Sequence, residues 1–158
     1  MDSAALASFS EPSVFLKAIE FVLTIISISV EQGGLASFSK QSGEFFFGGA
    51  MIMTITVSGL LLICYMLGQQ RHIQNTHFEF SFDCIGALFQ LTAGALAISE
   101  YAGKSGNEAA HANAAGSVCI VTSAVYIFDA YYAYINYRSI MTQPPPSQQN
   151  TQSLPPSI

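Results

Sequence analysis

Four apolar stretches follow one another along the chain, and short polar segments separate them. A helix rises about 1.5 Å per residue, so roughly 20 apolar residues cross the hydrocarbon core of a bilayer. We therefore expect four transmembrane helices, at residues 13–30, 45–67, 78–99 and 114–138. The pattern predicts an all-α membrane protein, a four-transmembrane-helix bundle with short loops.

The two ends of the chain differ from this pattern. Residues 1–12 form a short polar leader, with neither a basic segment nor an apolar core, so we expect no cleavable signal peptide and a leader that stays cytoplasmic. Residues 139–158 are rich in Pro, Gln and Ser. Such a segment cannot bury enough apolar surface to fold, so the composition predicts a disordered cytoplasmic tail.

The polar residues of the first stretch recur at helical spacing. They are separated by four, three, four and three positions and form one stripe: Ser13, Lys17, Glu20, Thr24 and Ser27. The side chain of Lys17 is expected to snorkel to the headgroups, whereas Glu20 lies nearly a turn deeper.

The third and fourth stretches also have two faces each. In the third, leucines oppose a small and polar stripe of Asp83, Gly86, Gln90, Ala93, Gly94 and Ala97. In the fourth, Ile120, Ala124, Ile127, Tyr131 and Ile135 oppose Thr122, Asp129, Ala133 and Asn136. We expect the small and polar stripes to face protein and the apolar ones to face lipid.

Alternating helix directions bring Lys17, Glu20, Asp83 and Asp129 into one half of the bilayer, the half that holds the termini. In a medium of low dielectric constant these acids cannot all stay ionised. At least one is expected to hold a proton or to take a donor such as Gln90 or a Tyr hydroxyl. The cluster is interpreted as a clamp that fixes helix neighbours or, alternatively, as a proton or ion relay. We favour the clamp because the other half offers mainly Thr, Ser and Gly.

Small residues allow helices to approach closely within a membrane. This predicts helix packing at Gly48, Gly59, Gly86, Gly94, Thr122 and Ala133. Cys64 and Cys84 lie near helix ends, where they are candidates for reversible S-palmitoylation or simply small apolar fillers. Cys119, at the opposite end, is interpreted as a filler.

Composition narrows the function further. Of the 158 residues 51% are hydrophobic and 9% charged, and the net charge of −5 argues against binding to nucleic acid. No pattern indicates a nucleophile with its base or a loop that cradles phosphate, so we expect no enzyme and no cofactor. The three histidines lie on both sides of the predicted membrane, so no metal site is expected.

The positive charges predict an orientation in the membrane. Three cations, Lys17, Arg71 and Arg138, lie on the side of the termini, against Lys40 and Lys104 on the other. Cytoplasmic loops carry an excess of Lys and Arg, so the count favours cytoplasmic termini.

Residues 13–138 resemble the MARVEL four-transmembrane family, which includes MAL, plasmolipin and the relatives of synaptophysin. The resemblance lies in FLKAIEFVL of the first span, FDCIGALF of the third and VYIFDAYYAYINYR of the fourth. It implies a non-enzymatic bundle with cytoplasmic termini that acts where membranes are apposed. It also implies roles in helix packing for Lys17, Glu20 and Asp129. The chain has no Trp and lacks the paired extracellular cysteines of some members.

The segment GSVCIVTSAVYIFDAYYAYINY is also similar to an insect protein of smooth septate junctions. We therefore expect an organiser of cell-cell junctions at the plasma membrane. Its expected partners are the lipid bilayer, other junctional or vesicle membrane proteins and further copies of itself. The alternatives are a protein of vesicle trafficking and apical sorting, and a small channel or transporter subunit that uses the intramembrane acids.

Overall fold

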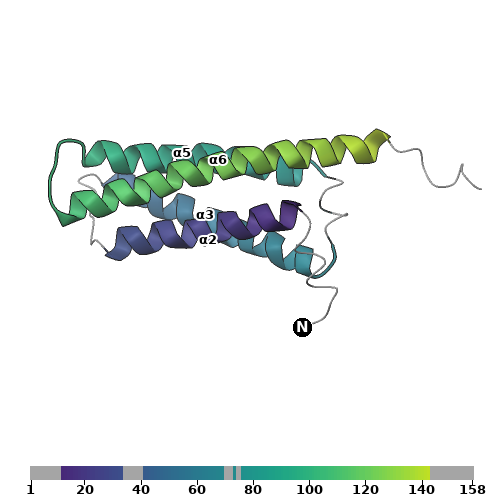
Figure 1. The fold of residues 1–158 in the computed structure, drawn as a ribbon, viewed down its shortest axis with the longest axis horizontal. Helices are drawn as coiled ribbons and strands as arrows, with labels where there is room; N and C mark the ends of the chain where they lie inside the picture. Colours follow the sequence, from purple (N-terminus) through teal and green to yellow (C-terminus); the bar gives the residue numbers. More distant parts are fainter. Residues whose placement is uncertain (1–11, 34–40, 70–72, 74–75, 143–158) are drawn as a thin grey trace, which may run out of the picture.

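The computed structural model describes residues 12–33, 41–69, 73 and 76–142, and these contain four long helices. They are α2 (Pro12–Gly33), α3 (Gln41–Met66), α5 (Phe78–Glu100) and α6 (Asn107–Thr142). The predicted all-α four-helix bundle is confirmed (Figure 1). Residues 1–11 of the predicted leader and 143–158 of the predicted tail lie outside the described residues.

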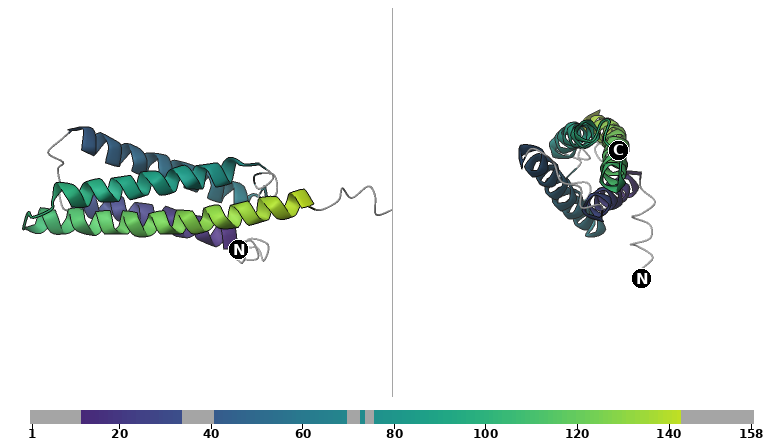
Figure 2. Two further views of the ribbon diagram at one scale, coloured as in Figure 1. Left: turned by 90° about the horizontal axis from the view of Figure 1, so that it is seen from above. Right: turned by 90° about the vertical axis from the view of Figure 1, so that its left-hand side faces the viewer.

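The helices form a ring in which α2 packs against α3 and α6, and α5 packs against α3 and α6. Seen along the bundle, the ring leaves α2 diagonally opposite α5 (Figure 2). Successive helices run in opposite directions. We call the end where α2 and α5 begin the terminal end, and the end where α5 and α6 are joined the loop end. The most extensive contact is between α5 and α6.

All four helices are long and apolar enough to cross a membrane. Their outward faces carry large apolar side chains that no described residue covers, such as Ile52 on α3, Leu88 on α5 and Ile127 on α6. Inside the bundle, by contrast, polar side chains are buried. A surface of this kind suits lipid rather than water, so the chain is a multi-pass integral membrane protein.

The helix α6 is longer than the predicted span 114–138 in both directions. It begins at Asn107 because the segment from 109 to 115 is mostly Ala, the strongest helix former. The remaining loop contains Gly103 and Gly106 at φ 78° and 127°, which glycine adopts without strain. At the other end the helix stops at Thr142, shortly before a run of prolines that disfavours helix in the preceding residue. Residues 139–142 are thus helical, not part of a disordered tail.

The core of the loop half combines small side chains of α5 and α6 with Phe47 and Met51 of α3. Its buried members include Ala93 and Ala97 of α5 and Ala115 and Cys119 of α6. At the centre of this contact the two helix backbones touch. A Cβ atom on Gly94 would lie 2.7 Å from the carbonyl oxygen of Gly116, and one on Gly116 would lie 2.8 Å from that of Gly94.

Candidate functional site

The polar stripe of α2 faces the inside of the bundle along its whole length. All five of its residues are buried: Ser13, Lys17, Glu20, Thr24 and Ser27. The opposite face of α2 is apolar and exposed, for example at Phe15 and Val22. Because lipid cannot hydrogen-bond to these polar groups, the stripe turns toward partners on the other helices.

The ammonium of Lys17 is the centre of a buried ion cluster. Its Nζ atom lies 3.1 Å from Glu20 Oε2 on the same helix. It also contacts Asp83 Oδ1 of α5, and it lies 2.7 Å from Asp129 Oδ2 of α6. We call Lys17, Glu20, Asp83 and Asp129 the ion cluster, and all four are 0% exposed. It ties α2, α5 and α6 together in the terminal half.

The predicted snorkelling of Lys17 is therefore wrong. An ammonium has three N–H donors, and here one oxygen of each of three carboxylates surrounds it. The rings of Phe82 and Tyr126 flank it as well, with centroids 5.7 Å and 5.6 Å from Nζ. Three carboxyl groups inside the bundle hold the ammonium more strongly than the headgroups at the surface, so the side chain points inward.

Electrostatic repulsion within the ion cluster is large. One oxygen each of Glu20, Asp83 and Asp129 lie within 4.8 Å of one another, so two ionised carboxylates repel by about 3.5 kcal/mol or more at an effective dielectric constant of about 20. Three carboxylates at this spacing could serve as ligands for a metal ion. Here, however, the ammonium of Lys17 already binds one oxygen of each, so the cluster has its own cation.

Three carboxylate oxygens of the cluster do not contact Lys17. These are Glu20 Oε1, Asp83 Oδ2 and Asp129 Oδ1, and no hydrogen-bond donor among the described residues reaches them. A neutral hydroxyl approaches the cluster at one other oxygen, where Ser58 Oγ of α3 donates to Glu20 Oε2 over 3.4 Å. Ser58 Oγ in turn lies 2.7 Å from the hydroxyl of Tyr126.

Gln90 does not join the ion cluster, although we predicted it as a donor to the acids. Its amide nitrogen donates to Thr54 Oγ1 over 3.1 Å and lies 3.9 Å from Met51 Sδ. Gln90 lies about two helical turns beyond Asp83 toward the loop end, where α3 faces it. It therefore links α5 to α3 instead of neutralising a carboxylate.

A fourth buried acid, Glu79, was missed by sequence reasoning. Glu79 is 1% exposed, and its Oε1 accepts a hydrogen bond from the hydroxyl of Tyr65 on α3. The spacing could have revealed it, because Glu79 precedes Asp83 by four residues on the same face of α5. Tyr126 was missed in the same way, since it lies four residues after Thr122 and three before Asp129.

The predicted packing residues fall into distinct environments. A Cβ atom on Gly86 would lie 2.9 Å from the ring of Tyr126, and one on Gly59 would lie 3.0 Å from the ring of Phe21. Gly48 differs, because no described atom lies within 4 Å of its Cβ position, so it makes no close contact in this part of the chain. Thr122 and Ala133 are buried on the inner face of α6.

The cysteines also differ in their surroundings. Cys64 and Cys84 are half-buried near the terminal end. Cys84 lines an apolar groove of about 280 Å³ between α5 and α6, together with Leu88 and Ile127. Cys119 is fully buried in the loop half, with its Sγ 2.9 Å from Ser27 Oγ.

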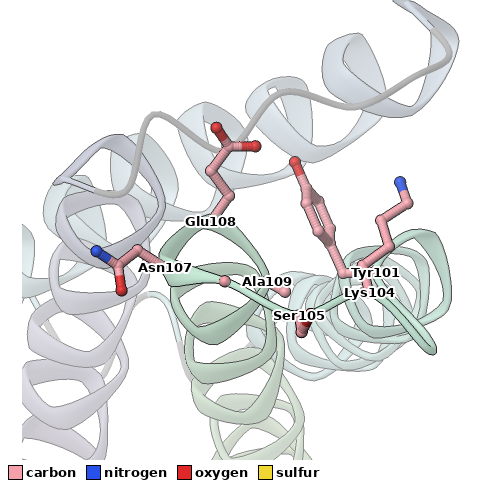
Figure 3. Close-up of a pocket in the computed structure, with 7 residues that line it drawn as sticks. Tyr101, Lys104, Ser105, Asn107, Glu108 and Ala109 are labelled. Carbon is pink, nitrogen blue, oxygen red and sulfur yellow. The ribbon is translucent and has the colours of Figure 1, made fainter.

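An open hollow of about 400 Å³ lies where α5 turns into α6. Figure 3 shows that Tyr101 and Lys104 rise from one side of it, while Asn107 and Glu108 diverge from the other. Lys104 packs over the ring of Tyr101, 4.7 Å from its centroid. These polar groups do not converge on one point, so the hollow does not form a binding site comparable to the ion cluster.

In comparisons with known proteins, no family model, no curated protein and no solved structure matches this chain. The MARVEL resemblance therefore stays a prediction from the sequence. The physical features on which function must be argued are a membrane-spanning bundle, an apolar exterior and a buried ion cluster.

Proposed function

We propose that the protein is a non-enzymatic organiser of membrane contacts, which assembles cell-cell junctions of the epithelial or septate type through lateral protein and lipid contacts. The observation that carries this proposal is the distribution of polarity. The described chain buries its charged cluster and exposes apolar side chains on all four helices. A surface of this kind binds lipids and other transmembrane helices.

The short connection at the loop end supports lateral contacts. Six residues, 101–106, join α5 to α6. Within the described residues every helix belongs to the bundle, so no folded domain extends from it toward a neighbouring cell. Partners are therefore reached within the plane of the membrane.

In this proposal the ion cluster is a clamp rather than a catalytic or conducting site. The ammonium of Lys17 contacts one oxygen of each of three carboxyl groups, which belong to α2, α5 and α6. Such contacts specify which helices are neighbours, because a wrongly packed bundle would leave buried charges without partners. A rigid bundle with a defined outer surface is what a scaffold for lateral partners needs.

The orientation in the membrane has weaker support than the sequence suggested. Lys17 is buried in the ion cluster and is not available to the headgroups. Without it, the count of cations is two on each side, Arg71 and Arg138 against Lys40 and Lys104. We keep cytoplasmic termini as part of the proposal on the basis of the family resemblance.

A channel or transporter subunit is the second candidate, and the burial of three acids around one lysine favours it. It predicts that Asp129→Asn abolishes a pH-dependent current while the protein still folds and reaches its membrane. The clamp predicts instead that folding or sorting suffers and that no such current exists in the wild type. Patch-clamp recording together with surface biotinylation separates the two.

The junction proposal is tested by imaging the endogenous protein in polarised epithelium. An antibody to residues 143–158 is applied before and after permeabilisation, beside markers of junctions and endosomes. We expect a continuous belt at cell borders that stains only after permeabilisation and breaks up when a junction partner is depleted. Intracellular puncta without border signal would refute the junction proposal and favour vesicle sorting. Staining of intact cells would refute cytoplasmic termini.

A further inference from the structure

The charges of the ion cluster do not balance. Lys17 is the one cation that contacts Glu20, Asp83 and Asp129 among the described residues. If all three carboxyls were ionised, two negative charges would remain uncompensated in a bundle surrounded by lipid. A buried carboxylate without a counter-ion takes up a proton rather than remain charged.

The ion cluster also lacks hydrogen-bond donors for its carboxyl oxygens. Lys17 donates hydrogen bonds to Glu20 Oε2 and Asp83 Oδ1. Its Nζ also lies 2.7 Å from Asp129 Oδ2, but that oxygen receives no hydrogen bond from the described residues. The second oxygens, Glu20 Oε1, Asp83 Oδ2 and Asp129 Oδ1, belong to fully buried side chains and receive no donor from the described residues. A carboxyl that holds a proton becomes a donor itself, so bound protons supply both the missing positive charge and missing donors.

No other helix supplies a second cation. The polar groups that face the cluster come from all four helices and, apart from Lys17, are acidic or neutral. They are Glu20 on α2, Ser58 and Tyr65 on α3, Glu79 and Asp83 on α5, and Tyr126 and Asp129 on α6. The nearby acid Glu79 supplies no positive charge either.

We infer that the ion cluster is a proton-binding site, which holds two protons per chain at neutral pH, shared among Glu20, Asp83 and Asp129. The protons come from water and form O–H bonds on two of the three carboxyls. The third carboxyl stays ionised and balances the ammonium of Lys17. This inference goes beyond the proposed function and holds wherever in the cell the protein works.

The next buried acid toward the terminal end is Glu79. It lies in the first turn of α5, one helical turn from Asp83 on the same buried face. The hydroxyl of Tyr65, near the end of α3, donates to it. Glu79 is 1% exposed and lies between the ion cluster and the end of the bundle, and we infer that protons exchange between Asp83 and the solvent by way of its carboxyl.

The test is infrared spectroscopy of the full chain in liposomes, in H₂O and D₂O. Protonated carboxyls have a C=O stretch apart from the bands of carboxylates, and D₂O shifts it. We expect the wild type at neutral pH to exceed the variant Glu20→Gln/Asp83→Asn/Asp129→Asn by two protonated carboxyls per chain. Lys17→Met should raise this excess to three, and the exposed control Glu108→Gln should leave it unchanged.

A wild-type spectrum without a protonated-carboxyl band would overturn the inference with no variant needed. An equal band in the triple variant would overturn it as well.

This route of proton exchange is tested by Glu79→Gln. This variant should retain the excess of two protonated carboxyls but exchange their protons for deuterium at least tenfold more slowly than the wild type. The matched control is Glu108→Gln, which should exchange at the wild-type rate. Unchanged exchange in Glu79→Gln would refute the route through this residue.

Discussion

The two halves of the bundle hold their helices together by different means. In the terminal half, Lys17 binds acids from α2, α5 and α6. In the loop half, the backbones of α5 and α6 touch at Gly94 and Gly116, among alanines. Lipid offers little hydrophobic driving force between helices, so buried polar bonds and close van der Waals contact take its place. The terminal half depends mainly on the first and the loop half mainly on the second.

The difference has energetic consequences. Removing one partner from a buried ion cluster leaves uncompensated charge, which costs far more than the lost contact itself. A close contact between glycines responds to added volume and is indifferent to charge. The terminal half should therefore be sensitive to charge and the loop half to size.

The largest effect is expected from Lys17→Met. This change leaves Glu20, Asp83 and Asp129 without their cation and should lower the free energy of unfolding by about 3–5 kcal/mol. Reversible unfolding by SDS in mixed micelles measures it. The control is Lys104→Met, since Lys104 lies 3.5 Å from Glu100 with 52% of its side chain exposed, and such surface pairs contribute about 0–1 kcal/mol. Equal losses in the two variants would refute the comparison.

Gly94→Ala tests the loop half. The added Cβ would lie 2.7 Å from the carbonyl oxygen of Gly116, which must force α5 and α6 apart at a cost of about 1–3 kcal/mol. Gly48→Ala is the matched control, because no described atom lies within 4 Å of the new Cβ. The free energy of unfolding of this control should not fall, and the higher helix propensity of Ala should raise it by up to about 1 kcal/mol. A loss in the control equal to that of Gly94→Ala would contradict the prediction.

Gly86→Ala shows whether the terminal half also depends on close packing. Its Cβ would lie 2.9 Å from the ring of Tyr126. A ring can shift more readily than a backbone carbonyl. We therefore expect the free energy of unfolding to fall by about 1 kcal/mol, at the low end of the range for overpacking. Thermal unfolding of Gly86→Ala and of the wild type in the same micelles measures this loss of stability. A loss larger than that of Gly94→Ala would show that the size-sensitive contact was assigned to the wrong half.

The smallest effect is expected from Ser27→Ala. The hydroxyl of Ser27 donates to the carbonyl oxygen of Ala115 over 3.3 Å and joins α2 to α6. Interhelical hydrogen bonds in membranes contribute about 0.6 kcal/mol on average. Ser29→Ala is the control, since that hydroxyl bonds to Ile25 in its own helix. A loss above that of Gly86→Ala would mean that the loop half relies on polar bonds too.

The sequence predicted the four apolar helices and the buried stripe of the first one because both follow from periodicity. The stripe from Ser13 to Ser27 is buried as its spacing indicates. What a helix meets across the interface is not encoded in its own spacing. Alternating helix directions place Asp83 and Asp129 in the same half of the bilayer as Lys17, but they do not show that both acids contact its ammonium, so Lys17 was assigned to the headgroups.

The same limit explains the errors at single residues. Gly48 and Gly94 look alike in the sequence, but within the described part of the chain Gly94 has a backbone opposite it, at Gly116, and Gly48 has none. Gln90 was paired with the acids by its helix face, yet its height along α5 places it beside Thr54. The burial of Glu79, in contrast, could have been predicted from the sequence, because its spacing of four residues from Asp83 places both on the buried face of α5.

The central claim is that the ammonium of Lys17 is needed because of the carboxyls around it. It is tested most directly by measuring the unfolding cost of Lys17→Met twice, in the wild type and in the variant Glu20→Gln/Asp83→Asn/Asp129→Asn. We predict a loss of about 3–5 kcal/mol in the wild type and little or none where the acids are neutral amides. The same loss in both backgrounds would contradict the account, because Lys17 would then contribute through packing alone.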